Sequence, residues 1–126
     1  MPDPRAWEAI RELDRRVTEQ GQSFSLTDEV RALLMDTSSD VAITPEEAER
    51  ALLSEASAAE LLKEIAKRIR MGSRRLSRAL VDSARCQEAG DTEAARKLLM
   101  DVLAVEVVPH YREIIRTQLD ALDDES

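Results

Sequence analysis

The feature that most constrains the fold is a long amphipathic run that extends from Ser57 to Ala89. Apolar side chains recur along it at helical spacing with little loss of phase, at Leu62, Ile65, Ile69, Leu76 and Leu80. A period of about 3.6 residues kept over this distance is typical of a helix that buries one face. A single helix cannot cover its own apolar stripe, so other segments must pack against it. We therefore expect an all-α protein built around this helix.

The composition agrees with helices and argues against a β fold. The chain has 126 residues, of which 43% are hydrophobic and 35% are charged, and it contains 3 Gly and 4 Pro. A β-sandwich or β-barrel needs a turn about every ten residues, and so few Gly and Pro cannot supply them. A chain of this length can bury about two-thirds of its unfolded surface around one core. We expect a single helical domain over residues 1–126.

Three shorter helices are predicted ahead of the long one. Each begins at a residue whose side chain can accept a hydrogen bond from the free amides of the first turn. The predicted spans are 4–20 after Asp3 and Pro4, 27–37 from Thr27, and 45–55 from a capping box of Thr44 and Glu47. Ser57 and Glu60 repeat the capping-box pattern, so we expect the long helix to span 57–89. Trp7 lies on the apolar face of the first helix and should be buried.

Gly72 lies on the apolar stripe of the long helix. A residue without a side chain lets another helix approach closely at that point. Alternatively, Gly72 ends one helix and Ser73 begins the next. The stripe keeps its phase across Gly72, which favours the close approach.

Gly90 and Asp91 predict a reversal of the chain, because a helix C-cap is followed at once by an N-cap. The next helix is predicted over 91–122. Its apolar stripe changes sides near Pro109, which has no amide to donate to the carbonyl of Val105. We expect a kink or a break there, and we predict a helical bundle built on a long antiparallel hairpin with a proline-kinked C-terminal helix.

The net charge limits the partners of the protein, and the single cysteine indicates its compartment. The chain has 18 Lys and Arg against 26 Asp and Glu, a net charge of −8, so on average it repels nucleic acids and anionic lipid. Cys86 is the only cysteine, which fits a reducing compartment. Neither a basic leader followed by an apolar run nor a membrane-spanning stretch is present. We expect a cytoplasmic protein with no membrane partner.

Few residues suggest catalysis. His110 is the only histidine, which excludes a two-histidine metal site within one chain. Glu106 and Glu113 lie near it at helical spacing and carry the enzymatic hypothesis, while a polar helix rim is the alternative. Cys86 fits a small core residue better than a nucleophile, and no phosphate-binding or nucleophile loop is present. We therefore expect no enzyme and no catalytic, cofactor-binding or metal-binding residues.

The most unusual local feature is a run of six cations without an intervening acid, which we call the basic stripe. It consists of Lys67, Arg68, Arg70, Arg74, Arg75 and Arg78. On a helix these residues lie opposite the apolar stripe, where they could dock an anionic partner. The alternative is a solvated face that acids elsewhere in the chain neutralise. The net charge and the lack of interleaved aromatic residues argue against nucleic acid, so an acidic protein face is the favoured partner.

Several phrases of the sequence resemble the DUSAM domain, a family of unknown function with many paralogues in myxobacteria. These phrases are Leu26-Thr-Asp-Glu-Val-Arg-Ala-Leu-Leu34, Arg68-Ile-Arg-Met-Gly-Ser-Arg-Arg-Leu76, Gly90-Asp-Thr-Glu-Ala-Ala-Arg-Lys-Leu98 and Val102-Leu-Ala-Val-Glu-Val-Val-Pro-His-Tyr-Arg112. The resemblance implies a bacterial, cytosolic, helical protein and brings no activity, cofactor or catalytic residue. An expanded set of paralogues would suit partner-specific adaptors or immunity-like proteins.

Taken together, these features predict a non-enzymatic cytoplasmic protein-interaction module that acts as an adaptor, an immunity-like factor or a regulatory binding protein. Its partner is an unidentified protein, and self-association is a further option. The alternative is a nucleic-acid-associated regulator that uses the basic face 67–78.

Overall fold

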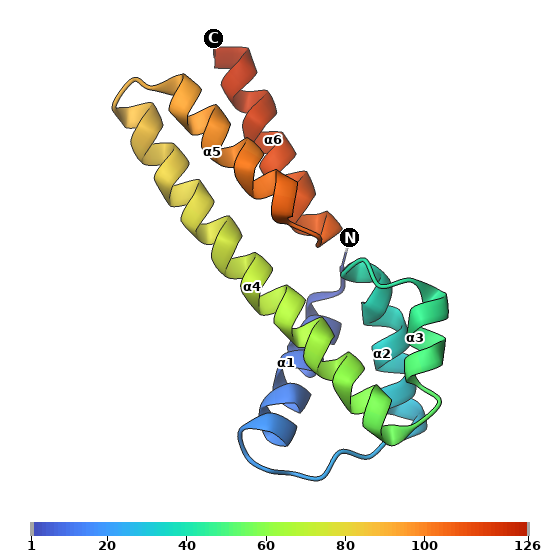
Figure 1. The fold of residues 1–126 in the computed structure, drawn as a ribbon. Coiled ribbons are helices and arrows are strands. Elements are labelled where there is room, and N and C mark those ends of the chain that lie inside the picture. The colour runs from blue at the N-terminus through green and yellow to red at the C-terminus, as the bar shows by residue number, and fades with distance from the viewer. Residues whose placement is uncertain (1, 126) are drawn as a thin grey trace. The chain divides into compact units, whose positions relative to one another are not determined.

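The computed structural model describes residues 2–125, which form six helices and no strand (Figure 1). The helices are α1 (Pro4–Thr18), α2 (Asp28–Asp40), α3 (Pro45–Ala51), α4 (Glu55–Glu88), α5 (Thr92–Val105) and α6 (Pro109–Glu125). The all-α prediction is therefore confirmed. Among these residues, no helix is both long enough and apolar enough to cross a bilayer.

Two compact units divide the chain, one up to Ile69 and the other from Arg70 onward. The long helix α4 contributes its first half to one unit and its second half to the other. Each unit buries apolar side chains of its own, and each is described separately below.

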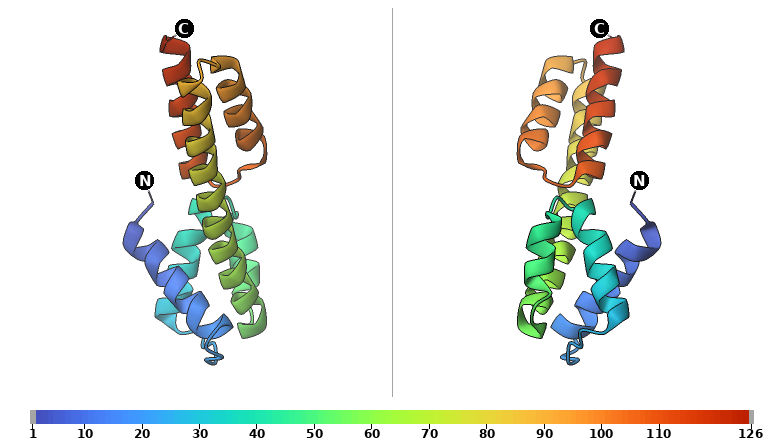
Figure 2. Two further views of the ribbon diagram at one scale, coloured as in Figure 1. Left: turned by 90° about the vertical axis from the view of Figure 1, so that its left-hand side faces the viewer. Right: turned by 90° about the vertical axis from the view of Figure 1, so that its right-hand side faces the viewer.

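The first unit gathers α1, α2 and α3 along the N-terminal part of α4 (Figure 2). Its core includes Ile10, Leu34 and Ile65, all of them fully buried. Trp7 is only 5% exposed, and its indole Nε1 donates a hydrogen bond to Asp40 Oδ2 at 3.1 Å. This contact joins the start of α1 to the end of α2 and confirms the predicted burial of Trp7.

The predicted N-terminal caps are largely confirmed. The side chains of Asp3, Thr27, Thr44 and Asp91 each accept a hydrogen bond from an amide of the first turn that follows. These interactions are local, so the order of residue types suffices to predict them.

The expected cap at Ser57 is wrong. The helix α4 begins earlier, at Glu55, because Ser54 accepts the Ser57 amide at 3.1 Å and takes the capping role. Ser57 lies within the first turn and donates its hydroxyl to the carbonyl of Ala51. The same turn ends α3 at Ala51, short of the predicted residue 55.

The second unit contains the rest of α4 together with α5 and α6. Gly90 has a φ of +79°, a conformation that favours glycine, and it turns the chain so that α5 runs back beside α4 (Figure 1). Arg96 on α5 donates to Asp123 on α6 at 2.8 Å. This hydrogen bond and the nearby charge of Glu93 raise the pKa of the Arg96 guanidinium.

Of the two expectations near Pro109, a kink or a break, the structure shows the break: the chain over 91–122 forms two helices and not one continuous kinked helix. α5 ends at Val105 and α6 starts at Pro109. The backbone at Glu106 is extended, with a φ of −72° and a ψ of 130°. Pro109 then occupies the first position of α6, where its missing amide costs nothing. The proline that was expected to kink or break a helix thus stands at the start of a new one.

Candidate functional site

The structure separates the basic stripe into cations with partners and cations without them. Arg68 belongs to the first group: its Nε lies 3.1 Å from Glu64 Oε1, and its Nη1 donates to the carbonyl of Val41 at 2.8 Å. Its side chain is 27% exposed. Arg68 therefore holds the turn after α2 against α4, which is a structural role.

Arg75 also has an internal partner. Its Nε lies 3.6 Å from Oε1 of Glu106, a carboxylate with no exposed surface. Oε2 of Glu106 accepts hydrogen bonds from the amides of Val107 and Val108 at 3.1 and 3.0 Å. The charge of Arg75 thus compensates a buried acid that holds the chain between α5 and α6.

Gly72 gives the α5–α6 connection room to approach α4. A Cβ at this position would lie 2.6 Å from the Tyr111 ring and 3.0 Å from Glu106 Oε2. Because α4 continues without interruption through this residue, the close-approach interpretation is confirmed and the helix-end alternative is wrong. The absence of a side chain lets the buried Glu106 and Tyr111 pack directly on the helix.

The other cations of the basic stripe point to solvent. Lys67, Arg74 and Arg78 are exposed, and within residues 2–125 they form neither hydrogen bonds nor ion pairs. Arg70 is exposed too, but it does have an interaction partner. Of the six predicted site residues, Arg68 and Arg75 are thus committed to the fold, whereas Arg74 and Arg78 remain available one helical turn apart.

Exposed apolar side chains adjoin these two arginines. We call the exposed row of the second half of α4 its outer face; it consists of Met71, Arg74, Arg78, Val81 and Arg85. Met71 is 44% and Val81 is 52% exposed, and Met100 and Val105 on α5 are exposed to a similar degree. An open hollow of about 570 Å³ lies along this face, lined by Met71, Ser73, Arg74, Arg75, Ser77 and Arg78.

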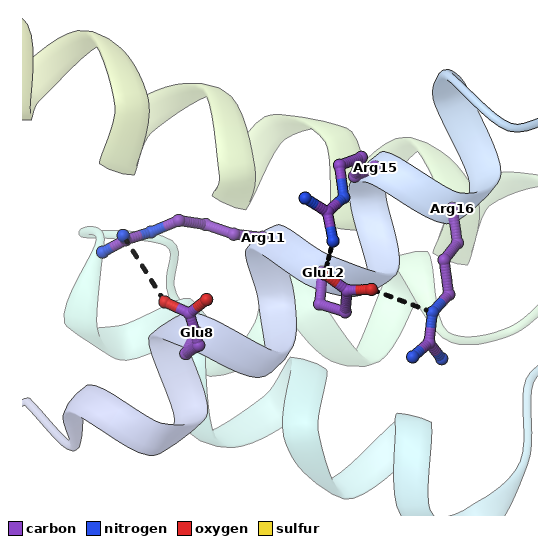
Figure 3. Close-up of polar contacts among 5 residues, drawn as sticks. All are labelled: Glu8, Arg11, Glu12, Arg15 and Arg16. Atoms are coloured by element: carbon purple, nitrogen blue, oxygen red, sulfur yellow. Dashed lines mark hydrogen bonds and ion pairs between the residues drawn. The ribbon is translucent and has the colours of Figure 1, made fainter.

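Helix α1 shows what fully paired surface arginines look like in the same chain (Figure 3). Arg11 lies 3.7 Å from Glu8, while Glu12 pairs with both Arg15 and Arg16. Such pairs three or four residues apart stabilise a helix locally and leave little charge for a partner. The outer face of α4 has a different character, because Arg74 and Arg78 form no ion pair within residues 2–125, whereas Arg85 lies 3.9 Å from Asp82.

The enzymatic hypothesis gains no support from the geometry. Glu106, one of the two carboxylates on which this hypothesis rests, is buried and already interacts with two backbone amides and Arg75. Glu113 is exposed on α6, and the ring centroids of His110 and Tyr111 are 6.0 Å apart. Across residues 2–125, no three His, Cys, Asp or Glu side chains gather as they would around a metal ion. Cys86 is half-buried on α4.

Sequence reasoning missed two features of this region. It placed Glu106 on a polar rim, although an acid shortly before a proline that can start a helix is a capping signal. It also overlooked Met71 and Val81 on the cationic face. The spacing of these two residues from Arg74 and Arg78 could have indicated that the face is partly apolar.

Comparison with known proteins gives a family and no activity. Residues 5–122 match a family described as a protein of unknown function (DUF2379). No curated protein matches the chain. No solved structure matches it either.

Proposed function

The chain belongs to the DUF2379 family of proteins of unknown function, and we propose that it is a non-enzymatic protein-interaction module that docks an acidic partner on the outer face of α4. One observation carries this proposal. Arg74 and Arg78 are exposed and without partners among the described residues, and exposed Met71 and Val81 lie on the same face.

The combination of charge and apolar surface fits a protein partner. Arginine and methionine are enriched at protein interfaces, where the apolar stem of arginine packs while its guanidinium pairs with a carboxylate. The chain carries a net charge of −8, so a local surplus of positive charge needs a reason. An acidic surface opposite Arg74 and Arg78 would supply the missing ion pairs.

Family-level features extend the proposal. We propose that the DUF2379 match and the DUSAM resemblance describe the same bacterial domain, because the resembling phrases lie within the matched residues 5–122. The lone Cys86 favours the cytoplasm as its compartment. A partner-specific adaptor or immunity-like role is the biological setting that we propose.

A second candidate function is nucleic-acid association. Of the basic stripe, Lys67, Arg74 and Arg78 have no partner among the described residues and could contact phosphates, which is the observation that favours this candidate. The net charge of −8 argues against this function. The apolar residues of the outer face argue against it too, because they make no favourable contact with phosphates.

Affinity capture of the tagged protein from its native lysate, with and without nuclease, tests the proposed function. We expect a nuclease-resistant protein partner that is retained by the native chain and lost from the double variant Arg74→Glu, Arg78→Glu. The matched control is Arg11→Glu, Arg15→Glu on α1, because both arginines are 54% exposed, lie four residues apart and give the same change of net charge.

Each other result would count against the proposed function. If the variant and the control retain the same proteins, the outer face of α4 is not the docking surface. If recovery disappears with nuclease, the nucleic-acid regulator replaces the interaction module. Circular dichroism and the fluorescence of the buried Trp7 verify that both variants are folded.

A further inference from the structure

The outer face of α4 has the spacing of a helix-pairing seam. Its members Met71, Arg74, Arg78, Val81 and Arg85 are separated by alternating steps of three and four residues, the pattern of the contact positions in a coiled coil. We propose that this seam binds one acidic amphipathic helix of a partner protein. The inference rests on the proposed function and specifies the form of the partner.

The seam is independent of the core of its unit. The core side of the same stretch of α4 consists of Gly72, Leu76, Ala79 and Ser83, all buried. The side of a helix opposite its core usually carries charged and polar residues, and here exposed Met71 and Val81 stand among them. Nothing within residues 2–125 pairs with Arg74 or Arg78 on that side.

The size of the seam defines the size of its partner. Met71 and Arg85 are 14 positions apart, which corresponds to about 21 Å along a helix. Ser77 and Ala84 flank the seam and are exposed, and their small side chains permit another helix to approach closely. A partner helix of about four turns would cover the seam.

Charge decides which helix fits. A second copy in parallel would place the arginines of one seam against those of the other, and an antiparallel pair centred on Arg78 would still place Arg78 against its own copy; like charges at packed positions oppose pairing. A partner helix needs Asp or Glu opposite Arg74 and Arg78 and an apolar residue opposite Met71 and Val81. Met71 is well suited to such a contact, because its flexible thioether adapts to different neighbours.

A designed peptide supplies the test. The probe is a fluorescent four-turn helix with Leu, Glu, Glu, Leu and Glu at its five seam positions, together with a second peptide in which this order is reversed for antiparallel pairing. The control peptide has the same composition with Leu and Glu moved off the seam. Titration with the native chain is followed by fluorescence anisotropy, and the gain of helix by circular dichroism.

We expect one of the two probes to bind at least about tenfold more tightly than the control peptide, a difference of about 1.4 kcal/mol. The double variant Arg74→Glu, Arg78→Glu should bind that probe with an affinity lower by a similar factor. The control variant Arg11→Glu, Arg15→Glu should bind it as tightly as the native chain does. A third peptide with Lys in place of Glu should bind the Arg74→Glu, Arg78→Glu variant and not the native chain. This reciprocal exchange shows that charge at positions 74 and 78 sets the choice of partner, and the control peptide of equal composition separates a seam from a merely electrostatic surface.

Equal binding of the probes and the control peptide would overturn the helix seam. It would leave the proposed function intact if protein capture still depends on Arg74 and Arg78. Concentration-dependent dimerisation that the Arg74→Glu, Arg78→Glu variant abolishes would identify a second copy as the occupant and overturn the acidic partner. Displacement of a bound probe by a short DNA duplex at equal concentration would assign the face to nucleic acid instead.

Discussion

At the scale of single residues, Glu106 connects three parts of the second unit. Its carboxylate accepts the amides of Val107 and Val108 and lies 3.6 Å from Arg75. The Glu106 side chain has no exposed surface whereas that of Arg75 is 34% exposed, so removal of Arg75 would leave the carboxylate uncompensated in the interior, which is costlier than the loss of an exposed pair. The residue is therefore structural, although its neighbourhood includes the only histidine.

Glu106→Ala should lower the free energy of unfolding by about 3 kcal/mol, because it removes the acceptor of two amides and the carboxylate beside the buried Nε of Arg75. Urea unfolding followed by circular dichroism measures the loss. The exposed Glu113→Ala is the control and should change stability by no more than about 0.5 kcal/mol. A loss below about 1 kcal/mol for Glu106→Ala would mean that the buried cap contributes little to the fold.

Gly72→Ala should destabilise the protein by about 1–2 kcal/mol even though alanine favours helices by about 1 kcal/mol over glycine. The added methyl group would lie 2.6 Å from the buried Tyr111 ring, so the ring or the helix must shift. In a Tyr111→Ala background the overlap with the ring disappears and only the 3.0 Å approach to Glu106 Oε2 remains, so the same substitution should cost less than it does in the native chain. Additive effects of the two changes in urea unfolding would argue against this contact.

At the scale of elements, the separation of α5 from α6 does not depend on Pro109 alone. Arg112 donates hydrogen bonds to the carbonyls of Leu103 and Glu106, which satisfies acceptors at the end of α5. The Glu106 carboxylate holds the amides just before α6. The helix end and the helix start are thus each fixed by a side chain from the other side of the break.

Pro109→Ala should therefore leave the two helices separate. We expect far-UV circular dichroism to show no gain of helix. The free energy of unfolding should fall by less than about 1 kcal/mol, because the proline ring stabilises the fold only by restricting the conformations of the unfolded chain. A rise in helicity together with a larger radius of gyration in X-ray scattering would show the opposite, namely that the proline alone prevents a continuous helix.

Features that depend on residues close together in the sequence could be predicted, whereas features that depend on distant residues could not. The caps at Asp3, Thr27 and Asp91 involve amides two or three residues away, so residue order is enough. The role of Glu106 depends on Arg75, which is distant in sequence, and on the space that Gly72 leaves. A periodic pattern cannot reveal such a partner.

The candidate site shows the same limit. In the sequence, Arg68, Arg74, Arg75 and Arg78 are equivalent members of one basic run. Only packing distinguishes them, because a carbonyl of Val41 engages the first and a buried carboxylate engages Arg75. The prediction of a positively charged helix was useful, whereas the assignment of individual arginines required the fold.

At the scale of the whole molecule, a net charge of −8 opposes the approach of any acidic partner. This repulsion acts over distances comparable to the Debye length, about 10 Å at 0.1 M salt, while the pairs of Arg74 and Arg78 form only at contact. Added salt therefore weakens the long-range repulsion and the local attraction together. The apolar contacts of Met71 and Val81 do not depend on screening.

The affinity of the acidic peptide probe should consequently fall less than about tenfold when salt rises from about 0.05 to about 0.5 M. A DNA duplex held by three phosphate contacts, from Lys67, Arg74 and Arg78, would instead lose about 500-fold in affinity. The reason is that the logarithm of its binding constant falls with the logarithm of the salt concentration at a slope of about −2.7. Anisotropy titrations of both ligands over this range separate the two outcomes. A slope steeper than about −2 for the peptide would mean that charge alone holds it, which would leave no role for the apolar half of the seam.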